Sequence, residues 1–412
     1  MVISALPDFR RLAVVLAAAL LLGSCTSEGD DPPDGEDRAA CDTSKGTLVV
    51  GVIAPLSGEL AEQGKGIANS TSLAVDQANE DCAVDGYRLV AQPEDDGMNP
   101  KLGAQAATKL AGTQNLVGVV STLNSSVSAK VQPILDSAGI LQVSPANTAD
   151  SLTRGENFRT DPKRQYPTYF RTCTVDSLQG PFAANYLVEK LGETDIAIVT
   201  DGLKYGEGLA DSFTERAEEK GATIVTRQRI DGKVTDFTRV IDALRPFDPD
   251  AVYFGGQYPQ AAPLSEQLAA AGLNVPVMGG DGIFHDAYLT AGGKEGDLAT
   301  SVGAPTEDLD SAQEFASAYE EKGYPEGFGA YGAFAYDAAN VIIGSLARTI
   351  GDGEWSPPMR EELVANVGEY EGDGATGKVA FDEFGDSTNH VLTVYEVRDG
   401  GWAAVETGEY ID

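Results

Sequence analysis

The apolar run LVVGVI at residues 48–53 decides the fold, because it predicts a strand that is buried on both faces. A turn at residues 55–58 follows it, then a helical pattern to about Asn79 and a second strand at residues 87–91. Strands of this kind are typical of parallel sheets, in which a helix connects each strand to the next. The opening of the chain therefore predicts an α/β fold.

The same alternation continues along the chain. Helices are predicted at residues 100–110 and 126–137, and strands at 116–120 and 140–143. The pattern restarts with a strand at residues 169–175, so a second α/β lobe is predicted to begin near residue 175. Its strands are expected at 196–199, 223–226, 251–254 and 275–278, and its helices at 179–191, 212–220, 237–244 and 261–271. Both lobes are expected to be doubly wound, with helices on both faces of a parallel sheet.

The C-terminal third has a different pattern. Helices are predicted at residues 312–322, 330–350 and 359–367, and residues 380–384 and 391–397 are expected to form a closing antiparallel hairpin. The helix at 330–350 is rich in small residues, which suits packing on a sheet. No linker after residue 40 is long enough to separate freely moving domains, so we expect the lobes to share several crossings of the chain.

The start of the chain indicates export and a lipid anchor. Residues 1–24 have a charged start, an apolar run and small residues before Cys25, which is the pattern of a bacterial lipoprotein signal. Cys25 would take the lipid, and residues 25–45 would form an acidic tether. The apolar run at 12–22 is shorter than the roughly 20 residues that span a bilayer. An ordinary signal peptide with an incidental cysteine is the alternative, and the pair Arg10-Arg11 leaves Sec and twin-arginine export open.

The composition allows two domains and disfavours polyanionic partners. The chain has 412 residues, is 42% hydrophobic and carries a formal net charge of −35. Nucleic acid and anionic membrane surfaces repel an acidic protein, so neither is expected as a partner. The charge is explained by solubility and need not describe the ligand. We expect a monomer.

The cysteines predict one disulfide. Cys41 lies just before the first strand, and Cys82 lies in the turn between the first helix and the second strand. In a doubly wound sheet these two points are neighbours at the same edge, and a disulfide can form outside the cell. We therefore predict a Cys41–Cys82 disulfide and a free, buried Cys173. The cysteine spacing and the two distant histidines favour neither a metal site nor histidine-based catalysis, and no cofactor is expected.

Polar side chains follow the predicted strands at their carboxyl ends, where doubly wound sheets bind ligands. Ser125 and Ser126 start a predicted helix, where hydroxyl and free backbone N–H groups favour a carboxylate. Thr148 can add a second hydroxyl, and Asp281, in a glycine-rich loop of the second lobe, can receive an ammonium. Together these groups fit a zwitterion such as an amino acid. The alternative is that Ser126 only caps a helix and Asp281 only forms a turn.

Five short motifs stand in order along the chain: Gly51-x-x-Ala54-Pro55-Leu56-Ser57-Gly58, Ser144-Pro145-Ala146, Phe170-Arg171-Thr172, Tyr205-Gly206-Glu207-Gly208 and Tyr336-Asp337-Ala338. Together they resemble the periplasmic binding proteins of the Leu/Ile/Val-binding family, over residues 46–395. The resemblance implies two flavodoxin-like lobes joined by three crossover strands, the type I fold. We expect lobe 1 at residues 46–174 and 304–378, and lobe 2 at 175–303 and 379–412.

The resemblance also implies roles for individual residues. Ser125 and Thr148 match the carboxylate-binding hydroxyls of the family, with Ala146 as a backbone partner. Asp281 stands where the Leu/Ile/Val binders place a Glu for the ammonium, and its shorter side chain would make contact through water. Tyr205 matches a tyrosine of the second lobe that closes over the ligand.

The side-chain pocket departs from the family pattern. Tyr331 falls near a pocket aromatic of the family, but Gln63 and Gln257 stand where the Leu/Ile/Val binders commonly have aromatic residues. Tyr258 could supply one of these rings by a small shift. Two buried amides make a more polar pocket, because each amide needs a hydrogen-bond partner. Asp201, at the end of a strand in the second lobe, completes the candidate ligand-binding residues.

Three functions are compatible with the sequence. The family feeds ABC importers with branched-chain or other amino acids, amides or urea, so the resemblance implies a binding protein that closes its lobes on a ligand and docks on a membrane permease. A surface-anchored sensor with the same fold would use the same closure. An extracellular enzyme would need paired carboxylates, which Asp95, Asp96 and Asp201 could supply, but no nucleophile motif such as G-x-S-x-G is present. We expect a binding protein and not an enzyme.

Overall fold

The computed structural model describes residues 41–231 and 233–410. The expected signal peptide, the lipidated Cys25 and the tether up to residue 40 lie outside the described residues, so they stay predictions. Within the part that is described, no helix is both long enough and apolar enough to cross a bilayer.

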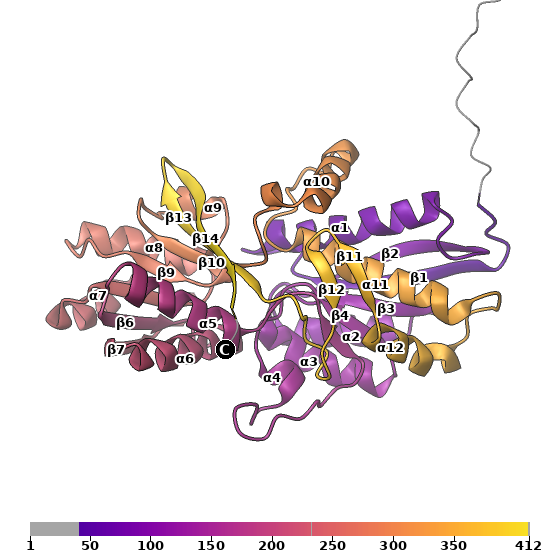
Figure 1. Ribbon diagram of the computed structural model, residues 1–412, viewed down its shortest axis with the longest axis horizontal. Helices are drawn as coiled ribbons and strands as arrows, with labels where there is room; N and C mark the ends of the chain where they lie inside the picture. The colour runs from indigo at the N-terminus through magenta and orange to yellow at the C-terminus, as the bar shows by residue number, and fades with distance from the viewer. Residues whose placement is uncertain (1–40, 232, 411–412) are drawn as a thin grey trace, which may run out of the picture. The chain divides into compact units, whose positions relative to one another are not determined.

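The first sheet has five parallel strands in the order β2-β1-β3-β4-β5 (Figure 1). The apolar run at residues 48–53 lies in β1, an interior strand between β2 and β3, and every residue of β1 from Leu48 to Ala54 is buried. The order 2-1-3-4-5 is that of flavodoxin-like sheets. The strands are β1 (Gly46–Ala54), β2 (Tyr87–Asp95), β3 (Leu116–Ser121), β4 (Leu141–Ser144) and β5 (Tyr169–Arg171).

Helices cover both faces of this sheet. On one face α2 (Pro100–Ala111) and α3 (Ser125–Ser137) form a core with side chains such as Ile53 of β1. On the other face lie α1 (Ala61–Glu80) and α11 (Gly332–Ile350), a helix that the chain supplies only after all the parallel strands of the second sheet. The remaining helices of this lobe are α4 (Ser151–Arg154), α10 (Asp310–Lys322) and α12 (Arg360–Gly368).

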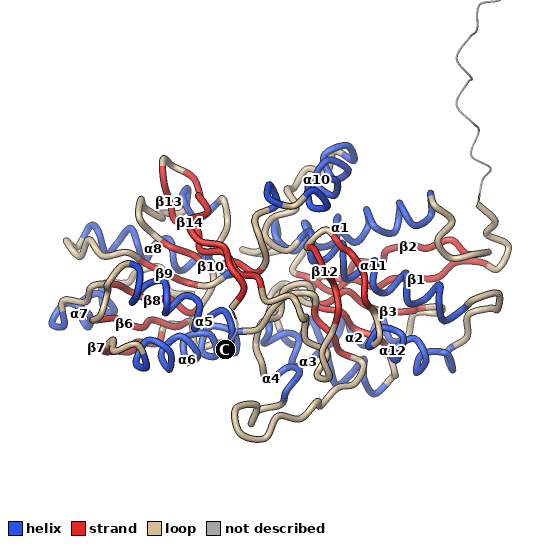
Figure 2. Tube along the Cα trace, viewed as in Figure 1, coloured by secondary structure: helices blue, strands red, loops and turns tan. Residues whose placement is uncertain are grey.

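The second sheet has the order β14-β13-β10-β9-β8-β6-β7. Its five parallel strands, β7-β6-β8-β9-β10, repeat the 2-1-3-4-5 order of the first sheet, and β13 and β14 add an antiparallel edge (Figure 2). The strands are β6 (Asp195–Thr200), β7 (Thr223–Arg229), β8 (Ala251–Gly255), β9 (Val277–Gly279), β10 (Leu298–Val302), β13 (Val391–Arg398) and β14 (Gly401–Glu409). The helices are α5 (Asp176–Asn185), α6 (Lys204–Glu219), α7 (Thr238–Leu244), α8 (Tyr258–Ala270) and α9 (Ala287–Thr290).

The expected α/β fold with two parallel-sheet lobes is confirmed. The chain passes between the two sheets three times, after β5, after β10 and before β13. The lobe boundaries stay predictions. The Cys41–Cys82 disulfide is formed, with 5.5 Å between the Cα atoms, and Cys173 is free and buried as expected.

Two local expectations are wrong. Only residues 169–171 of the segment 169–175 form a strand, which closes the first sheet beside β4, on the lobe 1 side of the expected boundary. The expected hairpin of residues 380–384 and 391–397 is also absent from the described part. β13 pairs with β10 and β14, while β11 (Glu371–Gly374) and β12 (Gly377–Ala380) form a separate two-stranded sheet.

Candidate ligand-binding site

Asp281 is held by one tyrosine from each lobe. It follows β9, is only 1% exposed, and opens a single 3-10 turn. Tyr205, at the start of α6, donates its hydroxyl to Oδ1 of Asp281 at 2.8 Å. Tyr331, which precedes α11 in the first lobe, donates to Oδ2 at 2.9 Å. The carboxylate therefore links the two lobes through the Tyr331 hydrogen bond.

Close packing of two glycines positions Tyr205. A Cβ atom on Gly255, the last residue of β8, would lie 2.1 Å from the carbonyl oxygen of Gly206. Only glycine permits this approach of α6 to the end of β8. The result is that the Tyr205 hydroxyl reaches Asp281 and also accepts a hydrogen bond from the Gly282 backbone N–H at 2.9 Å.

Burial controls the protonation of Asp281. Removal from water, the largest effect, raises the pKa of this carboxyl, and the hydrogen bonds from Tyr205 and Tyr331 act in the opposite direction. A nearby ammonium would favour the ionised form further, because opposite charges attract strongly in a buried site. Asp281 is thus suited to bind a cation.

The first lobe contributes a helix start and two hydroxyls. Ser125 is the first residue of α3, one residue earlier than expected, and no side chain caps this helix. Thr148 is fully buried, and its hydroxyl, which lies near the Asp176 carboxylate, has no partner of ordinary hydrogen-bond geometry among the described residues. Ala146, two residues before it, is also buried. Uncapped N–H groups beside an unpaired hydroxyl are a suitable environment for a carboxylate.

Ser126 has a different environment from the one expected. It is not the cap of α3, because Asn124 is the residue that precedes the helix. Its hydroxyl accepts a hydrogen bond from the backbone N–H of Lys204 in the second lobe, at 3.2 Å. Ser126 therefore connects the lobes.

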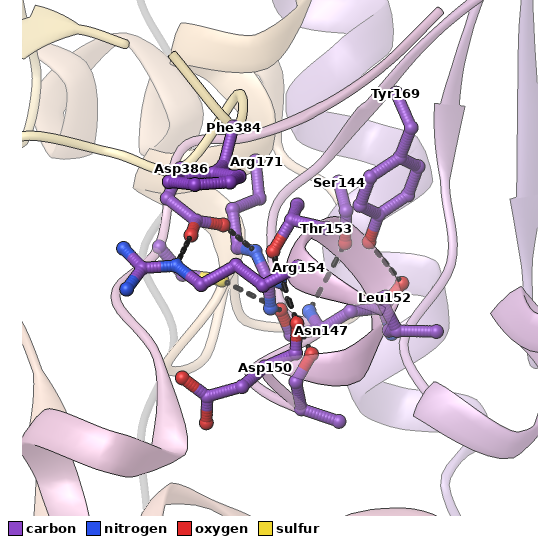
Figure 3. A network of polar contacts seen from close by, with 12 residues as sticks. Ser144, Asn147, Asp150, Leu152, Thr153, Arg154, Tyr169, Arg171, Phe384 and Asp386 are labelled. Atoms are coloured by element: carbon purple, nitrogen blue, oxygen red, sulfur yellow. Dashed lines mark hydrogen bonds and ion pairs between the residues drawn. The ribbon is translucent and has the colours of Figure 1, made fainter. Parts of the chain in front are cut away.

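A buried guanidinium fixes the backbone of the loop that contains Ala146 and Thr148 (Figure 3). Arg171, at the end of β5, is fully buried and donates to the carbonyl oxygens of Asn147 at 2.5 Å and Ala149 at 3.1 Å. The Asn147 side chain in turn donates to the carbonyl oxygen of Leu123 at 2.9 Å, two residues before Ser125. This network holds the two polar segments of the first lobe together.

Asp386 balances the charge of Arg171. Its Oδ1 lies 2.7 Å from Nε of Arg171, and its Oδ2 lies 2.8 Å from Nε of Arg154 (Figure 3). Burial would raise the pKa of Asp386, but the two guanidinium groups outweigh this effect and lower it. Asp386 belongs to the last passage of the chain between the sheets, so that passage is tied to the first-lobe binding loop.

The sequence reasoning missed Asp176, the first residue of α5. Asp176 is 1% exposed, and neither carboxylate oxygen has a hydrogen-bond partner of ordinary geometry among the described residues. Its backbone N–H donates to the carbonyl oxygen of Thr148 at 2.8 Å, and its charge acts on Asp281, Tyr205 and Tyr331. Burial, then the Asp150 charge, raises the pKa of Asp176 well above its usual value. An aspartate at a helix start is so common that its sequence context gives no signal.

The two glutamines are buried. Gln63, in the first turn of α1, is 2% exposed, and both atoms of its amide lack partners among the described residues. Gln257, just before α8, is 7% exposed with an unpartnered Oε1. Tyr258 does not replace a pocket aromatic, because its ring stacks on His285 and its hydroxyl donates to the Glu59 carbonyl oxygen of the first lobe.

Asp201 lies at the end of β6 and stabilises its own loop. Its Oδ1 accepts a hydrogen bond from the Leu203 backbone N–H at 2.8 Å, and burial raises its pKa to about 6. Asp95 has a comparable role at the end of β2, where it accepts hydrogen bonds from the backbone N–H of Leu56 and of Gly97. These two carboxylates organise loops. Among the described residues, no cluster of His, Cys, Asp and Glu could hold a metal ion.

A cavity of about 800 Å³ is lined by residues that are close to Asp281 and Tyr331 along the chain, although neither of these two residues lines it. Gln63 lines it, together with Phe284 and His285, which follow Asp281, and with Ala330, which precedes Tyr331. Its walls also include aromatic side chains from α10, the segment before α11, α11 itself and the β13–β14 edge: Tyr319, Tyr324, Phe328, Phe334, Tyr395 and Trp402.

Residues 47–402 match the family described as periplasmic binding protein. The chain belongs to the periplasmic binding protein family. This binding protein is 31% identical to the Leu/Ile/Val-binding protein BraC3 of Rhizobium johnstonii, over 87% of this chain and 94% of that protein. It is 30% identical to the leucine-, isoleucine-, valine-, threonine- and alanine-binding protein of Pseudomonas aeruginosa, over 85% and 90% of the two chains. The family consists of binding proteins and not enzymes, which agrees with the expectation from the sequence.

Solved structures have the same type I fold as this binding protein. The substrate-binding protein LivJ of a branched-chain amino acid transporter from Streptococcus pneumoniae, in complex with isoleucine, has a TM-score of 0.77 at 25% identity, with 88% of this chain and 99% of that chain covered. The leucine-binding protein LivK from Thermotoga maritima has a TM-score of 0.76 at 24% identity, with 87% and 98% covered. Both likenesses extend over the two lobes.

Removal of the Asp386 charge should destabilise the protein. Asp386→Asn leaves the Arg171 guanidinium buried without a counter-ion, so we expect a loss of about 3–5 kcal/mol in the free energy of unfolding, measured by urea denaturation. Asp382→Asn is the matched control, because the Asp382 side chain is 31% exposed, its ion pair with Arg154 is 3.1 Å long, and an asparagine oxygen can still accept its hydrogen bonds from the backbone of Phe384 and Asp386. The control should lose less than about 1 kcal/mol. Equal losses in the two variants would contradict the role assigned to the buried pair.

Asp176→Asn should stabilise the ligand-free protein at neutral pH. The folded protein raises the pKa of this carboxyl, so its ionised form opposes folding above pH 4 and the cost disappears on acidification. We expect a gain of about 1–3 kcal/mol at pH 7 that shrinks as the pH falls towards 4, measured by thermal denaturation across this range. A destabilised variant at pH 7 would show instead that Asp176 has a structural partner.

Proposed function

We propose that this protein is an extracytoplasmic solute-binding component of an ABC importer, and that it captures a small amino acid between its lobes. The observation that carries the proposal is the buried Asp281 carboxylate, which has hydrogen bonds to a tyrosine of each lobe. On the first lobe, the uncapped start of α3 and the unpaired Thr148 hydroxyl are suited to a carboxylate. An ammonium site and a carboxylate site on opposite lobes select a zwitterion.

Ligand capture would be a closure of the two lobes. The bonds from Tyr331 to Asp281, from Lys204 to Ser126 and from Tyr258 to the Glu59 carbonyl oxygen all cross between the lobes. Such contacts exist only when the lobes are closed, so a ligand that touches both lobes shifts the population towards this form. The closed form would then be recognised by a membrane permease.

The relatives support the transport assignment. Relatives at about 30% identity are named as binders of leucine, isoleucine and valine, and the S. pneumoniae protein belongs to a transporter. The pattern around Cys25 supports a lipid anchor that keeps the protein at the outer face of the cytoplasmic membrane. We assign Ser125, Ala146, Thr148, Tyr205 and Asp281 to the backbone of the amino acid, with Asp176 as a second carboxylate near the ammonium.

A ligand screen tests this function. The mature chain should be stripped of ligand by unfolding and refolding, then melted with each of the twenty amino acids, small amides, urea and benzoate. A ligand at one hundred times its Kd adds about 2.7 kcal/mol of stability, which a melting curve detects. We expect a shift with amino acids, whereas a response to benzoate or urea alone would overturn the zwitterion site.

Asp281→Ala should weaken amino-acid binding by more than tenfold, because the ammonium loses its buried counter-charge. Titration calorimetry measures the change. Asp250→Ala is the matched control, since Asp250 accepts hydrogen bonds from the backbone of Thr194 and Asp195 and from the Thr194 hydroxyl, at the opposite ends of the strands. In the unmodified protein, affinity should fall with acidification, because protonated Asp281 no longer attracts the ammonium. Unchanged affinity in Asp281→Ala would place the ammonium elsewhere.

A further inference from the structure

We infer that the ligand is an amino acid whose side chain ends in an uncharged carboxamide or similar group, held by Gln63 and Gln257. This inference rests on the proposed function, because it concerns the side-chain half of the same site. Its basis is that both glutamines are more than nine-tenths buried and have amide atoms with no partner among the described residues.

Gln257 faces the corner of the site that contains Asp281. A Cβ atom on Gly282, the neighbour of Asp281, would lie 3.0 Å from Oε1 of Gln257 and 2.9 Å from the ring of Tyr205. The unpartnered acceptor of Gln257 therefore lies beside the two residues assigned to the ligand ammonium. Tyr205 and Asp281 are already hydrogen-bonded to each other, so this acceptor needs a donor from another source.

Gln63 belongs to the first lobe and lines the cavity of about 800 Å³. His285, four residues after Asp281, and Ala330, the residue before Tyr331, line the same cavity. Glu62, the neighbour of Gln63, has a carboxylate oxygen 4.0 Å from Nε2 of His285. The cavity thus connects Gln63 with chain neighbours of Asp281 and Tyr331, and it can accept a side chain longer than that of leucine.

The unpaired atoms specify the chemistry of the side chain. Oε1 of Gln63 and Oε1 of Gln257 each need a donor, and Nε2 of Gln63 needs an acceptor. A carboxamide supplies two N–H donors and one carbonyl acceptor, which matches this set. A cationic side chain offers no acceptor, a carboxylate offers no donor, and a leucine side chain offers neither, so each would leave buried polar atoms unpaired.

Calorimetric titration of the unmodified protein with L-glutamine, L-asparagine, L-citrulline and L-leucine tests the inference. We expect at least one of the three amide or ureido amino acids to bind more than tenfold more tightly than leucine. Gln63→Leu and Gln257→Leu should each reduce this preference by at least tenfold. Both variants should fold, because an apolar side chain removes unpaired buried amide atoms, and their ligand-free melting temperatures should equal or exceed that of the unmodified protein.

The control variant is Gln228→Leu, which alters a half-buried glutamine of β7 that donates to the Thr226 hydroxyl and should leave the ligand ranking unchanged. Leucine binding as tightly as, or more tightly than, the amide amino acids would overturn the inference and leave the proposed function intact. Binding of acetamide or urea without any amino acid would overturn both. A preference for amides that survives both glutamine variants would also overturn the inference.

Discussion

The buried ion pair between Arg171 and Asp386 is the interaction on which the first-lobe binding loop depends. A guanidinium removed from water is tolerated only when a counter-charge and hydrogen-bond acceptors surround it. Here Asp386 supplies the charge, and backbone carbonyl groups of the loop supply acceptors. The carbonyl groups of the loop therefore take the place of water around the Arg171 guanidinium. Since Asp386 is on the last passage between the sheets, the loop is fully fixed only when the whole chain has folded.

The polar groups next to this network are satisfied very differently. Arg171 has three acceptors for its Nη1 and Nη2 groups and the Asp386 carboxylate beside its Nε, whereas Thr148, Asp176, Gln63 and Gln257 keep polar atoms without partners of ordinary hydrogen-bond geometry among the described residues. Unpaired buried atoms cost stability, and they cluster where function requires them. The Arg171–Asp386 network holds the loop in place. The side chains beside it keep hydrogen-bonding groups that a ligand can pair with.

The sequence was a good guide to local structure and a poor one to long-range pairing. The runs that became β1, β3 and β4 are continuous and apolar, so their burial in a parallel sheet could be predicted. The closing hairpin could not be placed by periodicity, because several C-terminal segments are plausible partners for one another. A local signal was present: Asp399-Gly400, both with positive φ, is the two-residue turn that joins β13 to β14.

The candidate site was predictable where a residue type follows a strand end. Asp281, Tyr205 and Tyr331 were all named from the sequence, and the structure brings them into one hydrogen-bonded group. Ser126 was named as a ligand-binding residue with a helix cap as the alternative; the cap position is taken by Asn124, and the contact of Ser126 with Lys204 could not be predicted because Lys204 belongs to the other lobe. Asp176 could not be predicted, because its lack of hydrogen-bond partners of ordinary geometry depends on how the surrounding side chains pack, which the sequence does not show.

The position of α11 has a consequence for the order in which the protein can mature. One face of the first sheet is covered by a helix that a ribosome produces only after it has synthesised all the parallel strands of the second sheet. Until α11 is made, the apolar face of β3 and β4 that it covers is exposed. Exposed apolar surfaces of this kind are recognised by chaperones and aggregate when unprotected. The N-terminal lobe is begun first but completed only after the parallel strands of the second, and β13 and β14 then complete the second sheet, so neither lobe can be regarded as an independent unit of biogenesis.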